Sequence, residues 1–61
     1  MTPLYSPDDL AELLAIPVAT LAQWRHRGLG PAYLTVGRHV RYRRADVETW
    51  LDGQQSSPRA S

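Results

Sequence analysis

The chain has 61 residues with seven arginines, no lysine and no cysteine, and its formal net charge is +1. This length accommodates one small domain, and the lack of cysteine excludes disulfides, thiolate metal sites and thiol nucleophiles. No apolar run approaches the roughly 20 residues of a membrane span, and no signal peptide is visible. We therefore expect a soluble, cytoplasmic protein.

The charges are unevenly distributed along the chain. Residues 1–24 contain three acids and no base, whereas residues 25–44 contain six arginines, both histidines and no acid. Residues 45–61 contain three acids and one arginine. Guanidinium groups are planar donors suited to phosphate and guanine. The basic segment is therefore a candidate nucleic-acid surface, with a merely solvated charged face as the alternative.

After a short lead-in over residues 1–5, the sequence predicts a helix over residues 7–14. Ser6 is a suitable cap and Pro7 fits the first helical position. Asp8 and Asp9 would lie in the first turn, where the helix dipole favours acids. One face carries leucines at helical spacing: Leu10, Leu13 and Leu14.

The segment Ala15-Ile16-Pro17 ends this helix, and a second helix is predicted from Pro17 to Arg27. Gly28 is its expected C-terminal stop. The side turned to the core would hold Thr20, Leu21 and Trp24. The opposite side would hold Val18, Ala19, Ala22, Gln23 and His26, with Arg25 at its edge. Two short helices joined by about three residues form a helix-turn-helix pattern.

The next two segments, residues 32–36 and 39–43, are rich in Tyr, Val and Thr and predict strands. Gly37-Arg38 between them suits a tight hairpin turn. A third helix is predicted from Arg44 to about Asp52, stopped by Gly53. The expected domain therefore spans residues 1–53, followed by a disordered tail over residues 54–61.

The expected core consists of large apolar side chains from all three helices and their connections. These are Leu10, Leu13, Leu14, Ile16, Leu21, Trp24, Leu29, Val47, Trp50 and Leu51. Gross burial of about 1.5–3 kcal/mol for each is largely offset by chain entropy. We therefore expect a marginally stable domain that a bound partner stabilises.

The second predicted helix has the size needed to enter the major groove of DNA. Its small outward side chains, Val18, Ala19 and Ala22, permit close approach and can meet thymine methyl groups. Gln23, Arg25 and His26 are equipped to read base edges, and Thr20 can reach a phosphate from the helix edge. Because so few side chains can contact base edges, we expect one copy of the protein to bind with modest sequence specificity.

The predicted hairpin would bring further basic groups to the neighbouring groove or its phosphates. Arg38 and His39 would stand at its tip, and Arg41 and Arg43 would alternate along one face. An arginine in a narrow minor groove reads shape more than sequence. Arg27 is expected to face away from the groove, and Arg44 to mark the entry to the third helix.

Other polar and aromatic residues have structural interpretations. Trp24 and Trp50 are expected in the core, whereas Tyr33 and Tyr42 can either cover the core or offer hydroxyls to phosphates. The two histidines have no companion ligands, so no metal site or cofactor is expected. With no nucleophile beside a base and no phosphate-binding loop, no catalytic role is expected either.

The segments 6–14, 16–24 and 37–51 together resemble the excisionase-type winged-helix family, which is related to the MerR-like helix-turn-helix group. The resemblance covers residues 4–52. It implies a mainly α fold with a β-hairpin: two helices forming a helix-turn-helix, a hairpin wing, and a third helix behind. Two positions depart from the family's usual pattern, namely Ala15 where Gly is common and Pro17 where a small polar residue is common.

The resemblance also implies a function. Excisionases of this family bind several sites in a phage attachment arm, often cooperatively, and bend the DNA. They direct a tyrosine integrase toward excision of the prophage. The implied partners are double-stranded DNA, with helix 2 in the major groove and the wing in the minor groove, the integrase and other copies of the chain. The implied location is the bacterial cytoplasm, at the nucleoid when bound.

Two alternatives share these sequence features. A small winged-helix transcriptional regulator binding a promoter would use the same DNA-binding surface. A protein-interaction module would instead use the wing for a protein partner. If four or five arginines neutralise phosphates, log K should fall with log salt at a slope of about −4, whereas a flat response favours the protein partner.

Overall fold

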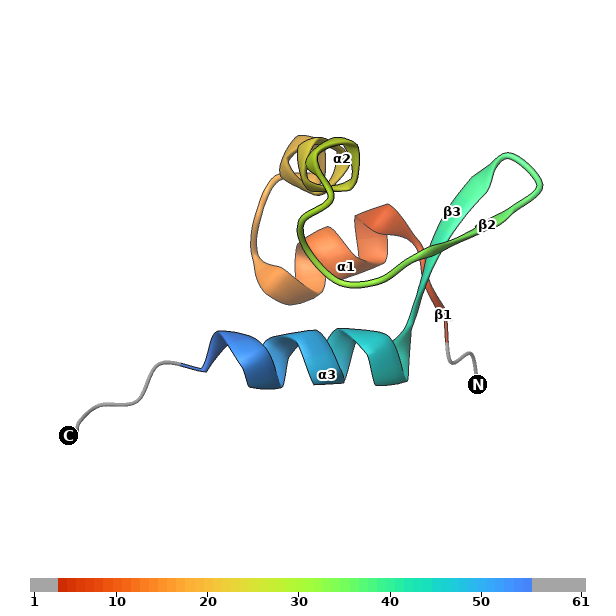
Figure 1. Cartoon of the computed structure of the whole chain (residues 1–61). Helices are drawn as coiled ribbons and strands as arrows, with labels where there is room; N and C mark the ends of the chain where they lie inside the picture. Colours follow the sequence, from red (N-terminus) through yellow and green to blue (C-terminus); the bar gives the residue numbers. More distant parts are fainter. Residues whose placement is uncertain (1–3, 56–61) are drawn as a thin grey trace, which may run out of the picture.

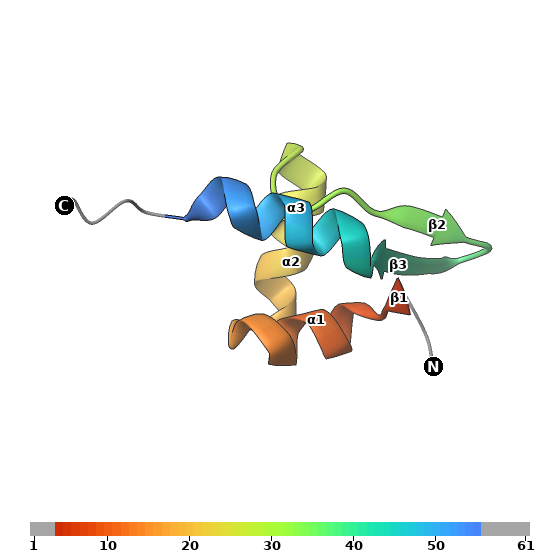
Figure 2. The same cartoon turned by 90° about the horizontal axis from the view of Figure 1, so that it is seen from below.

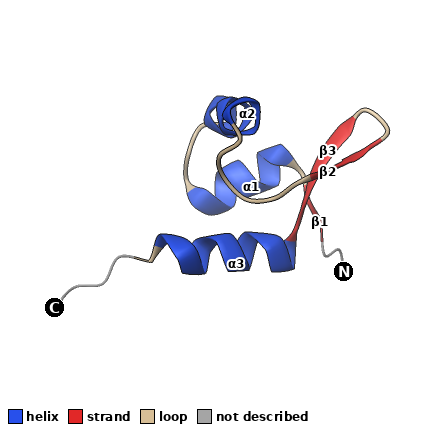
Figure 3. Cartoon of the chain, viewed as in Figure 1, coloured by secondary structure: helices blue, strands red, loops and turns tan. Residues whose placement is uncertain are grey.

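The computed structural model describes residues 4–55, which form three helices and a small sheet (Figure 1). The elements in chain order are β1 (Leu4–Tyr5), α1 (Pro7–Leu14), α2 (Val18–Arg27), β2 (Leu34–Val36), β3 (His39–Arg43) and α3 (Arg44–Gln54). This arrangement confirms the predicted fold, a mainly α winged helix-turn-helix (Figure 3). Within residues 4–55, every helix is too short or too polar to cross a membrane.

The start of α1 follows the predicted capping pattern. The Ser6 hydroxyl accepts a hydrogen bond from the Asp9 backbone N–H at 3.0 Å, and the Asp9 carboxylate accepts one from the Ser6 N–H at 3.4 Å. This reciprocal capping box satisfies donors that the first helical turn leaves unpaired. At the other end, Ala15 adopts the left-handed region with φ of 58° and caps the helix.

Helix α2 begins one residue later than predicted. Pro17 is its N-cap, with an extended backbone (φ −65°, ψ 144°), and the Pro17 carbonyl accepts a hydrogen bond from the Thr20 N–H at 3.0 Å. The fixed φ of proline suits this position as well as the first helical one. The predicted stop at Gly28 is confirmed, because Gly28 is the C-cap in the left-handed region with φ of 73°.

The sheet contains one strand more than the sequence predicted. The lead-in residues Leu4 and Tyr5 form β1, which pairs antiparallel with Arg43 and Tyr42 of β3. The strand order is β1-β3-β2, so β3 is central. A two-residue strand carries no alternation that a sequence pattern can reveal. The β2–β3 hairpin, residues 34–43, is called the wing below.

The end of α3 also differs from the prediction. The helix continues through Gly53 to Gln54, so the expected stop at Gly53 was wrong. Glycine lowers helix propensity by about 1 kcal/mol but breaks no backbone hydrogen bond. Gln54 is thus helical and Gln55 is the C-cap. The rest of the predicted tail, residues 56–61, lies outside the described residues.

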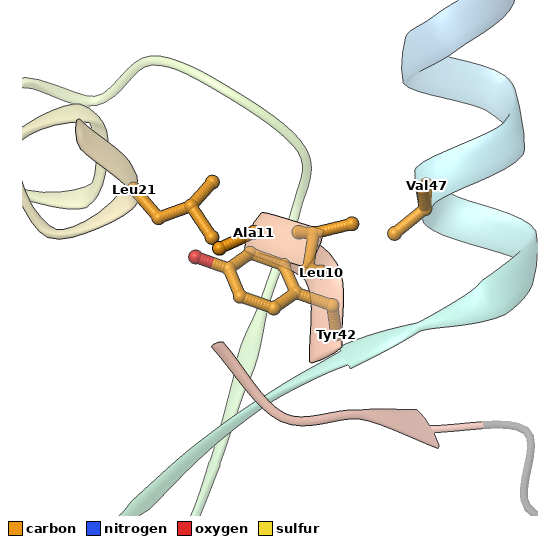
Figure 4. Packing of buried hydrophobic residues seen from close by; sticks show 5 residues of the cluster. All are labelled: Leu10, Ala11, Leu21, Tyr42 and Val47. Atoms are coloured by element: carbon orange, nitrogen blue, oxygen red, sulfur yellow. The ribbon is translucent and has the colours of Figure 1, made fainter. Parts of the chain in front are cut away.

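The core lies where α1, α2, β3 and α3 meet (Figure 4). Its buried apolar residues are Leu10, Ala11, Leu21, Tyr42 and Val47, with Tyr5, Leu14, Ile16, Trp24 and Val40 packed partly against them. In Figure 2, α2 is seen crossing behind α3, where Trp24 and Trp50 bring their ring centroids to 5.4 Å. Trp24 therefore packs against the core as expected, whereas Trp50 packs on Trp24 outside the core cluster, and both are half-buried.

Three residues expected in the core are exposed instead. Leu13, Leu29 and Leu51 expose 54%, 52% and 39% of their surface. So small a domain has too little interior to enclose every apolar side chain of its helices. Conversely, Tyr42 is buried with 1% exposure, which settles its role as a core residue.

Candidate nucleic-acid interface

The outward face of α2 is the one that the sequence predicted. Val18, Ala19, Ala22, Gln23 and His26 are all exposed. On the opposite side Leu21 is buried, while Thr20 and Trp24 are half-buried. The exposed face is therefore mostly small and uncharged, and it ends in polar side chains toward the C-terminus of the helix.

A shallow hollow marks the C-terminal half of this face. It is lined by Ala22, Gln23, His26 and Arg27. The expectation that Arg27 faces away from this side was therefore wrong. At about 100° per residue, Arg27 lies only about 40° beyond Gln23 around the helix axis. That spacing can be read from the sequence, and it adds an arginine to the C-terminal end of the exposed face of α2.

Arg25 occupies the other edge of α2, and its side chain is engaged within the protein. It is half-buried, and its Nη1 donates a hydrogen bond to the Tyr42 hydroxyl at 2.8 Å. Its guanidinium carbon also lies 5.9 Å from the centroid of the Tyr33 ring. The predicted base-reading group is thus held between two tyrosines, away from the centre of the exposed face.

The wing projects away from the helices, with its tip at the Gly37-Arg38 turn (Figures 1 and 3). The flanking pair is Val36 and His39. Gly37 has φ of +61°, and the φ of Arg38 is negative. This combination is the one that a type II′ turn with glycine first requires. Arg38 and His39 are both exposed, so the structure brings two basic side chains to the tip as predicted.

Further along β3, successive side chains point to opposite faces of the sheet. Val40 and Tyr42 turn toward the core, and Arg41 and Arg43 share the other face with His39. Arg41 is half-buried, and its Nη1 donates to the Val40 carbonyl at 2.7 Å. Arg43 lies at the base of the wing, where its Nη1 is 3.9 Å from Asp46 Oδ2. Of the three wing arginines, Arg38 at the tip is the one without such a contact.

Arg44, the first residue of α3, is engaged by an acid of the same helix. Its Nε donates to Glu48 Oε2 at 3.1 Å, and both side chains are more than half exposed. This hydrogen bond and the charge of Glu48 raise the pKa of Arg44. Within residues 4–55, no cluster of three His, Asp or Glu side chains could hold a metal ion.

Two acids of α1 lie on a different part of the surface. A second hollow is lined by Leu4, Tyr5, Asp9, Glu12 and Leu13, where α1 runs beside β1. It combines two carboxylates with an exposed leucine. The structure thus separates the acids of α1 from the arginines of α2 and the wing tip, whereas Asp46 and Glu48 of α3 lie beside Arg43 and Arg44.

Comparison with protein families matches residues 4–55 to the helix-turn-helix domain. Comparison with curated proteins gives no match, and comparison with solved structures gives none either. The matched range includes every helix and strand described above. Domains of this family are typically non-enzymatic and bind double-stranded DNA with sequence specificity. The chain therefore belongs to the helix-turn-helix domain family of DNA-binding proteins.

Proposed function

We propose that the protein is a phage excisionase that binds and bends DNA at several neighbouring sites and directs a tyrosine integrase toward prophage excision. One observation carries this proposal: the exposed face of α2 has few base-reading groups, while the wing tip adds positive charge beside it. A single copy so equipped reads DNA weakly. Several copies side by side on one attachment arm would supply the missing specificity.

The proposed DNA contacts divide between the two elements. In the major groove, Gln23, His26 and Arg27 would read base edges, and Thr20 would approach a phosphate. The small side chains beside them, Val18, Ala19 and Ala22, would allow α2 to come close to the bases. In the adjacent minor groove or along its phosphates, the wing would contribute Arg38, His39, Arg41 and Arg43.

This division supports a bending function. Reaching two adjacent grooves with elements held in one small domain favours a duplex that curves toward the protein. Arginine is attracted to a narrowed minor groove, where the negative potential is enhanced. The extra wing contacts would offset the cost of deforming the duplex, which is of order 1–6 kcal/mol for a smooth bend.

Cooperative binding by neighbouring copies would use the acidic hollow of α1 and β1. Its carboxylates, Asp9 and Glu12, complement the arginines that a second copy carries on α2 and the wing. The exposed Leu13 at the same hollow adds apolar surface that a contact would cover. Opposite charges of this kind orient partners and raise association rates.

Recombination in vitro tests the proposed function. The assay contains the protein, the integrase encoded nearest to its gene, and a plasmid with the two prophage attachment sites. Excision product should increase severalfold with the protein and fall with Arg38→Ala. If the amount of excision product is the same with and without the protein, at concentrations that saturate the DNA, the excisionase role is contradicted. If the same protein concentration does not change excision but represses a promoter in a transcription assay, the alternative, a transcriptional regulator, is favoured.

The cooperative contact has its own test, on duplexes with one or two adjacent sites. Glu12→Gln should leave affinity for one site unchanged and reduce cooperativity between two sites. Asp8→Asn is a matched control, because Asp8 lies exposed on the same helix but outside the hollow. Equal cooperativity in wild type and Glu12→Gln would rule out this hollow as the contact.

A further inference from the structure

We propose that Arg25 is a positioning residue that fastens α2 to the wing, and not a reader of base edges. This inference deepens the account of how the chain binds DNA. It rests on the proposed placement of α2 and the wing in adjacent grooves, and it does not depend on excision. The evidence is the packing of the two elements and the three side chains that meet between them.

The reading helix and the wing have largely separate supports. Helix α2 packs mainly on α1, whereas β3 packs on β1, β2, α1 and α3. Figure 1 shows the wing extending away from α2, so the far end of the hairpin has no helix beside it. The core joins the two elements near Leu21 and Tyr42. The orientation of α2 relative to the wing then depends on side chains that connect the two elements outside the core cluster.

Arg25 makes one such link through a buried hydroxyl. Its Nη1 lies 2.8 Å from Tyr42 Oη, and Tyr42 is only 1% exposed. Figure 4 shows that the hydroxyl oxygen of Tyr42 lies on the side of its ring toward Leu21 of α2. A hydrogen bond from a charged donor is stronger than one between neutral groups. The bond ties the last turn of α2 to β3, the central strand of the sheet.

A second contact holds the same guanidinium from another direction. The Arg25 guanidinium carbon is 5.9 Å from the centroid of the Tyr33 ring, within the range of a cation–π interaction. Tyr33 directly precedes β2, and its ring centroid lies 6.2 Å from that of Tyr42. One side chain of α2 is therefore held by tyrosines from both sides of the hairpin.

This arrangement explains how a small domain can place two elements at once. DNA binding is weakened by the entropy lost when mobile parts become fixed, so an orientation set in the free protein strengthens it. Turning the Arg25 side chain out toward a guanine would instead give up the bond to Tyr42 and leave a buried hydroxyl without this donor. The contacts favour the positioning role.

The test is a double-mutant cycle with Arg25→Ala and Tyr42→Phe. Binding is measured by fluorescence anisotropy on a duplex that the wild-type protein selects from random DNA. Tyr42→Phe removes one oxygen and keeps the core ring. Tyr5→Phe is the matched control, because it makes the same change at a half-buried site in the acidic hollow. Circular dichroism confirms helix content, and a repeated selection with Arg25→Ala gives its base preferences.

A positioning role predicts that Tyr42→Phe weakens binding about 3- to 10-fold, while Tyr5→Phe binds within twofold of wild type. The double variant should bind no more weakly than Arg25→Ala alone, since both changes remove one link. The selection profile of Arg25→Ala should keep the wild-type base preferences. Loss of a guanine preference at one position, or effects of the two changes that simply multiply, would overturn the inference.

Discussion

The two parts of the proposed DNA surface differ in chemistry. The exposed face of α2 is small and nearly uncharged over its first half, with polar groups only from Gln23 onward. The tip of the wing presents two basic side chains, Arg38 in the two-residue turn and His39 at the start of β3. The helix has a shape that fits a groove, and the wing has a charge that any phosphate backbone attracts.

This difference predicts that specificity and affinity depend on separate elements. Phosphate contacts fix position without reading sequence, whereas contacts to base edges discriminate between sequences. A change on α2 should therefore alter which DNA is bound, and a change on the wing should alter how tightly all DNA is bound. A change in the corner between them, the loop of residues 28–33, should lower stability without selectively altering specificity or affinity, because this loop supports the fold.

The largest effect is expected at that corner, from Gly30→Ala. Gly30 has φ of +82°, and an added Cβ would lie 2.9 Å from Trp24 Cε3. Left-handed strain and the overlap together should lower the free energy of unfolding by about 2–4 kcal/mol. Thermal unfolding followed by circular dichroism measures this loss. Trp24 cannot easily yield, because it packs against Trp50.

Gly28→Ala separates the two causes of that loss. Gly28 has a similar φ of +73°, but an added Cβ would meet no atom within 4 Å. Its cost should be the backbone strain alone, about 1 kcal/mol. If both variants lose the same stability, the close approach of Gly30 to Trp24 contributes nothing.

On the helix, Gln23→Ala should change specificity. Gln23 is exposed beside His26 and Arg27 in the hollow of α2. A glutamine that pairs with adenine contributes about 1–3 kcal/mol of discrimination, so preference at one base pair should fall about tenfold. Selection from random DNA, repeated with the variant, measures this. An unchanged profile would show that the assigned face of α2 does not read bases.

On the wing, Arg38→Ala should weaken binding to all sequences alike, by about fivefold at moderate salt. Removing one phosphate contact should also reduce the slope of log K against log salt by about 0.9. Arg44→Ala is the matched control, because Glu48 already engages that guanidinium, and it should bind within twofold of wild type. Equal losses for both variants would contradict a special role of the wing tip.

Much of this comparison was predictable from residue patterns. Ser6, Pro17, Gly28 and Gly37 each mark a boundary through a strong local preference, and the structure uses all four at caps or turns. The outward face of α2 followed from helical spacing. These features depend on neighbours along the chain, which a sequence displays directly.

Features that depend on distant residues were missed. β1 exists only because Leu4 and Tyr5 pair with β3, about 40 residues later. Tyr42 could be assigned to the core only once α1 and α2 were seen to cover it. The engagement of Arg25 by Tyr42 likewise joins residues 17 positions apart. Arg27 is a different case, since its place beside Gln23 followed from spacing alone.

The smallest effects are expected where α1 turns into α2 and near the end of α3. Ala15 holds φ of 58°, a conformation that glycine adopts without strain, whereas Gly53 lies inside α3 with open space around it. Ala15→Gly should therefore raise the free energy of unfolding by about 0.5–1 kcal/mol, and Gly53→Ala should do the same because alanine favours helix.

Each exchange replaces a residue that disfavours its local backbone conformation, so each serves as a control for the other in thermal unfolding. A gain of about 1 kcal/mol raises the midpoint by about 4–8 °C in a domain of this size. Neither position lies on the exposed face of α2 or on the wing, so the DNA affinity of each variant should stay within twofold of wild type. A change in base preference with Ala15→Gly would show that the turn before α2 controls how the helix enters the groove. Specificity would then depend on the angle of α2 as well as on its side chains.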